Sequence, residues 1–95
     1  MSVKLLVLKS YEDVIAEVAE ISNGLSITHY KLSNPYVTRL DNDKVTYYPY
    51  LPLSKDTDIT IPSDWVVTVA TPLDEIEKSY LENLNEKPKN FNIEE

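Results

Sequence analysis

The 95-residue sequence contains no cysteine, and this absence excludes two classes of structure. A disulfide framework needs paired cysteines, and a thiolate zinc site needs several of them. The chain also has a single glycine, so it lacks the glycine-rich loop that cradles phosphate groups in nucleotide-binding proteins. We therefore expect a fold held by its apolar core, and a cysteine-free chain suits a reducing cytoplasm.

Long hydrophobic runs are absent as well. The apolar run near the N-terminus, Leu5 to Leu8, has only four residues. A signal peptide needs a longer apolar stretch with a cleavage site, and a membrane span needs about 20 apolar residues. We expect a cytoplasmic chain that is neither secreted nor bound to a membrane.

Positive charge is scarce. Nine lysines and arginines stand against sixteen acidic residues, for a formal charge of −7. Residues 1–72 have a net charge of −3 and residues 73–95 a net charge of −4, so the last quarter of the chain is the most acidic. Proteins that bind nucleic acid carry clustered basic side chains, and no such cluster occurs here. The charge pattern argues against general RNA or DNA binding and leaves room only for a small local site.

The pattern of residues 1–72 predicts one all-β domain. Short runs rich in β-branched and aromatic residues alternate with turn residues, as in small barrels. Asn23-Gly24 suits a tight turn with positive φ, and Asn34-Pro35 is expected to interrupt the extended structure. The expected extended segments are Val3 to Lys9, Leu25 to Leu32, Tyr36 to Leu40, Val45 to Tyr50, Ile59 to Ile61 and Trp65 to Ala70.

The segment from residue 10 to residue 21 fits two patterns. Val14, Ile15, Val18 and Ile21 have helical spacing, and local pattern alone slightly favours a helix. The same residues also alternate as a strand. The strand interpretation is chosen because of the family resemblance given below.

Residues 73–84 are predicted to form one helix packed on or beside the barrel. Thr71 can cap it, Pro72 suits a first helical position, and Asp74 complements the helix dipole. Residues 85–95 are polar and acidic, and we expect them to form a flexible tail.

Three stretches resemble Sm-like (Lsm-type) proteins, in the divergent form found in phages of cyanobacteria. They are Tyr11 to Val18, Leu32 to Pro35, and Ile59 to Val67, within a likeness that covers Lys4 to Pro72. The resemblance implies a strongly bent, five-stranded open barrel, also described as SH3-like. It further implies a phage-encoded protein that acts in the cytoplasm of the host cell.

The resemblance also implies a homo-oligomeric ring. In Sm-like proteins the fourth and fifth strands of adjacent subunits pair with each other, and an open barrel has free strand edges that such pairing satisfies. Here those strands would be Val45 to Tyr50 and Trp65 to Ala70. The expected interface residues are Val45, Tyr47, Tyr48, Tyr50, Trp65, Val67 and Val69.

The family's RNA site is only partly present. It uses an Asp/Asn-rich turn after the second strand and an Arg-Gly pair between the fourth and fifth strands. This sequence has Asn23 at the first place and Pro62-Ser63 at the second, so the arginine that would contact phosphate and stack on bases is missing. The candidate RNA-binding residues are Asn23, Ser63 and Tyr47, the last as part of a tyrosine-rich stretch that could stack on bases.

The sequence contains no recognisable catalytic motif. His29 is the only histidine, and a strand histidine facing solvent is the simpler interpretation. Two Asp-x-Asp pairs, at residues 41 and 43 and at residues 56 and 58, lack the rest of a calcium-binding loop and suit turns. We therefore expect a protein that is not an enzyme and has no metal or cofactor: a ring-forming scaffold that can bind a protein partner. The alternative is a diverged RNA-binding ring acting in RNA metabolism.

Overall fold

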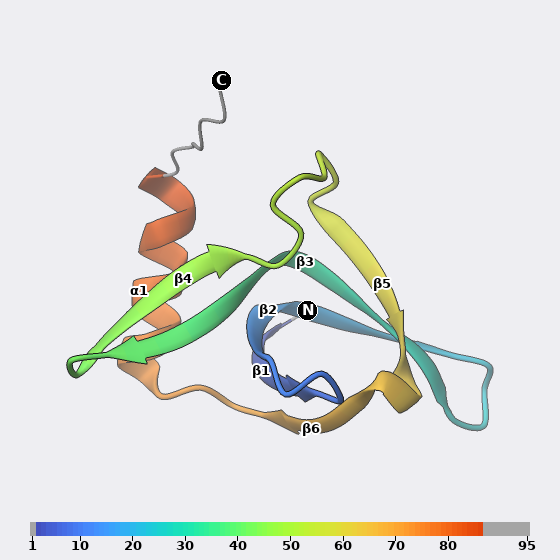
Figure 1. The fold of residues 1–95 in the computed structure, drawn as a ribbon. Helices are drawn as coiled ribbons and strands as arrows, with labels where there is room; N and C mark the ends of the chain where they lie inside the picture. The colour runs from blue at the N-terminus through green and yellow to red at the C-terminus, as the bar shows by residue number, and fades with distance from the viewer. Residues whose placement is uncertain (1, 87–95) are drawn as a thin grey trace.

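The computed structural model describes residues 2–86 and shows a bent antiparallel sheet with one helix against it (Figure 1). The prediction of an all-β fold with one C-terminal helix is confirmed. In chain order the elements are β1 (Ser2–Leu8), β2 (Asp13–Ser22), β3 (Ile27–Asp41), β4 (Lys44–Pro49), β5 (Asp58–Pro62), a 3₁₀ turn (Ser63–Trp65), β6 (Val66–Ala70) and α1 (Asp74–Glu86).

The sheet has the strand order β4-β3-β2-β1-β6. Strand β5 also pairs with β3, along a different part of that strand from β4. Strand β3 pairs with β5 through its first half and with β4 through its second half. The six described strands therefore occupy five positions across the sheet, rather than forming five separate strands as predicted. The path ends at β4 and at β6, so the described strands form an open sheet.

The ambiguous segment is strand β2, so the strand interpretation is confirmed. Val14, Ala16 and Val18 are buried on the barrel side of the sheet. Ile15 is fully buried on the opposite side, in a cluster with Tyr80 of α1. Because both faces of β2 are covered, apolar residues occur at odd and even positions alike. This arrangement explains why the local spacing resembles that of a helix.

The predicted break at Asn34-Pro35 is instead a bend within one 15-residue strand, β3. Asn34 has a φ of 52°, and the register between β2 and β3 shifts beside it. The backbone N–H of Asn34 donates to the carbonyl of Thr57 at 2.7 Å, and the carbonyl of Pro35 accepts from Tyr50 N–H at 3.0 Å. The missing N–H of proline is tolerated here because β3 exchanges one partner strand for the other at this point.

The predicted turns are present with the expected backbone. Gly24 has a φ of +98°, and Asn42 and Asp43 both have positive φ in the two-residue turn between β3 and β4. Two consecutive residues of this kind match the twist of a hairpin. Between the last two expected extended segments, Pro62 ends β5 and Ser63–Trp65 form a 3₁₀ turn, so the last strand begins at Val66 and not at Trp65.

Two clusters of buried side chains lie on opposite faces of the sheet. The barrel cluster is formed by Leu6, Leu8, Val14, Ala16, Val18, Leu32 and Ile61. The helix cluster is formed by Val3, Ile15 and Tyr80, with Leu5, Tyr36, Tyr47, Ile76 and Leu84 packed around them. Side chains of the barrel cluster thus cover one face of the sheet, and α1 covers the other.

Helix α1 begins at Asp74 and extends two residues past the predicted end. Thr71 does not cap it, because it stands three residues before the first helical residue; its Oγ1 accepts a hydrogen bond from Lys4 Nζ at 3.1 Å. The carbonyl of Leu73 accepts the first helical N–H groups, and the Leu73 side chain is exposed. Of the predicted tail, residues 85 and 86 are helical and residues 87–95 lie outside the described residues. Within residues 2–86, α1 is too short and too polar to cross a bilayer.

Candidate functional site

Strand β6 is exposed along nearly its whole length. It pairs with β1 on one side, and no described strand pairs with its other side. Its sequence, Val-Val-Thr-Val-Ala, contains no charge, and four of the five residues are exposed. Natural edge strands are commonly protected by charged side chains or prolines, because unprotected edges pair with other strands. Strand β6 has neither kind of protection.

The side of β6 that faces the core is only partly covered, by the packing of Val66 on the buried cluster. Val69 lies opposite Leu6, which is fully buried, and residues opposite each other on paired strands share a face. Val69 therefore faces the core, yet 39% of it is exposed. Val67, where the register with β1 shifts, is 62% exposed. Covering these valines would stabilise the protein by roughly 25 cal/mol for each Å² of apolar surface removed from water.

Trp65 extends this apolar edge at the start of β6. Its carbonyl accepts a hydrogen bond from the backbone N–H of Lys9 at 2.9 Å, which fixes the backbone beside β1. Its side chain, the only indole in the sequence, is 40% exposed. Large, partly exposed aromatic residues of this kind are enriched at protein interfaces.

Strand β5 provides a second free edge. It pairs with β3 on one side, and no described strand pairs with the other. Ile59 and Ile61 pack against the barrel cluster, whereas Asp58 and Thr60 are exposed. The Asp58 carboxylate lies 3.7 Å from Lys31 Nζ on β3, an exposed pair. The sequence predicted this strand but not that one of its edges is free, because the pairing of β5 with β3 is not visible in the local sequence pattern.

Strand β4, predicted as an interface strand, is partly used within the chain. The hydroxyl of Tyr47 donates to Ser79 Oγ of α1 at 3.0 Å, and its ring centroid lies 6.4 Å from that of Tyr80. Val45 is on the same face as Tyr47, while Tyr48 faces the other way and is 48% exposed. Tyr50 follows β4 and packs on the barrel cluster. The predicted interface residues thus lie on two separate edges, and only those on and beside β6 form one exposed apolar strip.

The three candidate RNA-binding residues do not form one site. Ser63 Oγ donates to the carbonyl of Ile27 at 2.9 Å, close to the turn that carries Asn23. The Asn23 side chain accepts from the N–H groups of Leu25 and Ser26, so it holds the turn together. Tyr47 lies under α1, on a different part of the sheet.

The tyrosines do not form a continuous stacking platform either. Tyr36 and Tyr47 contact Tyr80 under α1, whereas Tyr30 and Tyr50 pack against the barrel cluster on the opposite face. Of the tyrosines between residues 30 and 50, Tyr48 is the exposed one, with the guanidinium carbon of Arg39 lying 5.6 Å from its ring centroid. One exposed ring with one arginine does not provide the succession of stacked bases that single-strand binders use.

One family matches almost the whole of this sequence. The matching model is that of DUF6561, a family of unknown function, and it covers residues 1–85. The chain belongs to the DUF6561 family. No curated protein matches the sequence.

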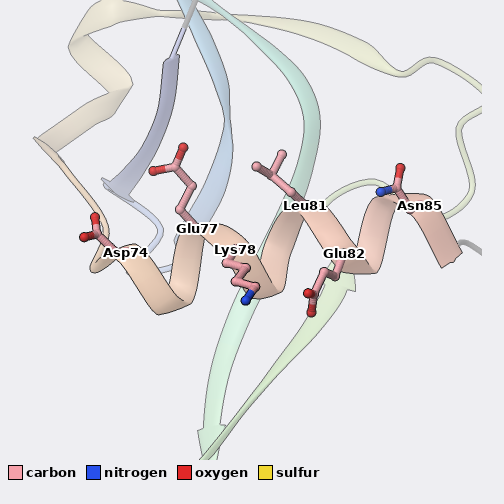
Figure 2. A pocket seen from close by; sticks show the side chains of 6 residues that line it. All are labelled: Asp74, Glu77, Lys78, Leu81, Glu82 and Asn85. Carbon is pink, nitrogen blue, oxygen red and sulfur yellow. The ribbon is translucent and has the colours of Figure 1, made fainter.

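A shallow hollow of about 340 Å³ runs along one flank of α1 in the DUF6561 chain (Figure 2). Its lining side chains all come from this helix: Asp74, Glu77, Lys78, Leu81, Glu82 and Asn85. No second element contributes a converging group to this hollow, unlike a typical ligand site, which is concave and mostly apolar. The flank is an acidic helix surface facing solvent.

The polar residues weighed as catalytic or metal-binding remain dispersed. The ring of His29 contacts the hydroxyl of its neighbour Thr28 at 3.0 Å. Within residues 2–86, no three His, Asp or Glu side chains gather as metal ligands would. Asp43 lies in the β3–β4 turn, and Asp58 lies beside Lys31.

The pKa of Tyr80 gives a testable pH dependence in this DUF6561 protein. Burial, then the nearby Glu17 and Tyr36, raise that pKa above its ordinary value of 10.0. Above that pH the unfolded chain ionises at Tyr80 while the folded chain does not, so the unfolded state binds fewer protons and stability falls as pH rises. We expect the free energy of unfolding to fall less between about pH 9 and about pH 11 in Tyr80→Phe than in the parent. Denaturant titrations at the two pH values measure this, and equal losses in both proteins would contradict it.

Proposed function

We propose that this DUF6561 protein is a non-enzymatic Sm-like scaffold that assembles with copies of itself into a closed ring and presents that ring to a protein partner. The uncharged and uncovered strand β6 is the observation that carries the proposal. The backbone groups on its outer edge have no partner strand among the described residues, and Val67 and Val69 are exposed. A second copy of the chain carries a free strand edge that β6 can pair with, and it is always present at the same concentration as the first.

The strand arrangement supports an Sm-like barrel. Strands β4 and β5 share the position beside β3, so the sheet has five positions, as the resemblance implies. The last strand returns to pair with the first, and a bent strand, β3, spans the barrel. Small barrels of several families have these features. The free strand edges, and not the fold, therefore support assembly.

The two free edges favour a ring over a symmetric dimer. Strands β5 and β6 are different surfaces, and contact between different surfaces of identical subunits is heterologous. Heterologous contacts close into a ring when the rotation between neighbours divides a full turn. An assembly of this type leaves no free edge at which further copies can add.

The mass of the protein in solution tests the proposal. Light scattering over a range of protein and salt concentrations is expected to give a constant mass, roughly five to seven times that of the 10.9 kDa chain. A chain that stays monomeric at every concentration would rule out the ring. A mass that rises without limit would indicate a filament instead.

The RNA-binding alternative has weaker support. The candidate residues are separated in space, and the net charge of −7 opposes binding to a polyanion. Binding of oligouridine that weakens steeply with salt would favour this alternative, and it can be measured on the same preparation.

A further inference from the structure

The turn between β2 and β3 has the features of a site at which the chain modifies itself. Residues Asn23 to Ser26, which connect the two strands, are all exposed, and Asn23 is followed by the only glycine of the sequence. We infer that Asn23 deamidates in the folded protein, through attack of the backbone nitrogen of Gly24 on the side-chain carbon Cγ of Asn23. The reaction is intramolecular and needs no second copy of the chain, so it is separate from the proposed self-assembly.

The reaction proceeds through a cyclic imide, and water is its only co-reactant. The Gly24 N–H first loses its proton, and a bond forms between that nitrogen and Asn23 Cγ. The side-chain nitrogen of Asn23 takes up a proton and leaves as ammonia. Water then adds to either carbonyl carbon of the imide, and the bond from that carbon to the Gly24 nitrogen breaks. Breakage at Cγ gives aspartate, and breakage at the main-chain carbon gives isoaspartate, in which the chain runs through the side chain.

Gly24 leaves the attacking nitrogen accessible. A Cβ atom on this residue would crowd the approach of its nitrogen to the neighbouring amide, and glycine has none. Gly24 has a φ of +98°, and a Cβ atom added to it would meet no atom within 4 Å, so the surroundings are open as well. Within residues 2–86, the Gly24 N–H donates to no acceptor. The nitrogen is therefore available to lose its proton and attack.

The side chain of Asn23 is held close to the peptide bond that attacks it. Asn23 Oδ1 accepts hydrogen bonds from the N–H of Leu25 at 3.0 Å and from the N–H of Ser26 at 3.1 Å. The first of these bonds closes a small ring that contains both Asn23 Cγ and the Gly24 nitrogen. Both donors also point at the oxygen that becomes negative when the nitrogen adds to Cγ, and donors aimed at developing charge lower the barrier. The turn thus both positions and activates the amide.

The turn between β3 and β4 provides an internal control. Asn42 is exposed there and also has a positive φ, of 51°. It is followed by Asp43, whose side chain crowds the backbone nitrogen and whose carboxylate opposes the negative charge that this nitrogen acquires. The two turns therefore compare the same residue type at exposed positions, with and without a following glycine.

The two products change the β2–β3 hairpin differently. Aspartate keeps the backbone, and its carboxylate can accept the same two N–H groups in charge-assisted hydrogen bonds. Isoaspartate lengthens the backbone between residues 23 and 24, so the hydrogen bond from Asn23 N–H to the carbonyl of Ser26, at 3.2 Å, loses its geometry. That bond closes the turn beside the pair Ser22–Ile27, and the Ile27 carbonyl accepts from Ser63 Oγ in the 3₁₀ turn before β6. We expect isoaspartate to loosen the hairpin and its contact with this 3₁₀ turn.

Incubation of the folded protein at mildly alkaline pH, followed by peptide mass spectrometry, tests the modification. We expect Asn23 to convert at least about tenfold faster than Asn42, which corresponds to a barrier lower by about 1.4 kcal/mol. Both products should form at residue 23, and the rate should rise with pH because the attacking nitrogen has to lose its proton. Equal conversion of the two asparagines, or none at Asn23, would show that the turn is not a modification site.

Two variants of Asn23 serve as controls. Asn23→Ser keeps an oxygen that can accept the turn N–H groups and cannot form the imide, so its release of ammonia should be lower than that of the parent. Equal release would place the reaction at another residue. Asn23→Asp supplies the aspartate product directly, and we expect it to unfold at the temperature of the parent, whereas the purified isoaspartate form unfolds at a lower one. An isoaspartate form as stable as Asn23→Asp would overturn the expected effect on the hairpin.

Discussion

Replacing Val67 with lysine is expected to reduce the solution mass from that of the assembly to that of a single 10.9 kDa chain. Val67 is 62% exposed in the isolated chain, so lysine is tolerated there without loss of the fold. In the assembly the ammonium group would be held against apolar side chains. The cost is at least about 3 kcal/mol per interface, or more than about a hundredfold in the association constant. Light scattering and thermal unfolding together measure the two effects.

Leu25→Lys is the matched control for this variant. Leu25 is 95% exposed in the β2–β3 turn, outside β6, and the change in charge and apolar surface is similar. We expect Leu25→Lys to keep the mass of the parent. If Val67→Lys also kept that mass, β6 would not be the assembly edge.

Replacing Tyr80 with alanine is expected to be the most destabilising single change in α1. Tyr80 is fully buried, and its hydroxyl donates to the carbonyl of Asn34 at 2.8 Å. Its ring lies 6.3 Å from that of Tyr36 and 6.4 Å from that of Tyr47. Losing a buried aromatic ring typically costs about 3–5 kcal/mol, a large fraction of the total stability of a small domain. Chemical denaturation measures the change in the free energy of unfolding.

Tyr80→Phe separates the ring from the hydroxyl. It keeps the packing on the sheet and loses only the hydrogen bonds at the bend in β3, at an expected cost of about 1 kcal/mol. A cost for Tyr80→Ala as small as that for Tyr80→Phe would mean that α1 contributes little by packing on the sheet.

Much of the strand pattern could be predicted from the sequence, because turns leave strong local signals. Gly24, Asn42 and Asp43 occupy the positive-φ positions that their residue types suggest. The helix was also predictable from the spacing of Ile76, Tyr80 and Leu84, although its first residue was not, since Thr71 binds Lys4 instead of capping.

The parts that could not be predicted depend on contacts distant in sequence. Ile15 is buried against Tyr80 of α1, a contact distant in sequence, and this second covered face gave β2 its helix-like spacing. The bend at Asn34 is stabilised by Thr57 and Tyr50, which approach only once β4 and β5 pair with β3. The free edge of β5 likewise follows from the complete topology. Tyr47 was expected at an interface, but its hydroxyl is bound to Ser79 of α1.

The pairing of β1 with both β2 and β6 has a consequence for how the chain folds during synthesis. Strand β1 leaves the ribosome before the other described strands and can form a hairpin with β2 soon afterwards. The other edge of β1 stays unpaired until β6 (Val66–Ala70) emerges, because β6 is the second partner of β1. Long-range pairing of this kind slows folding and leaves apolar strands open in the meantime. The sheet is therefore completed only after β6 has emerged, and the second edge of β1 stays open while the four strands between them are synthesised.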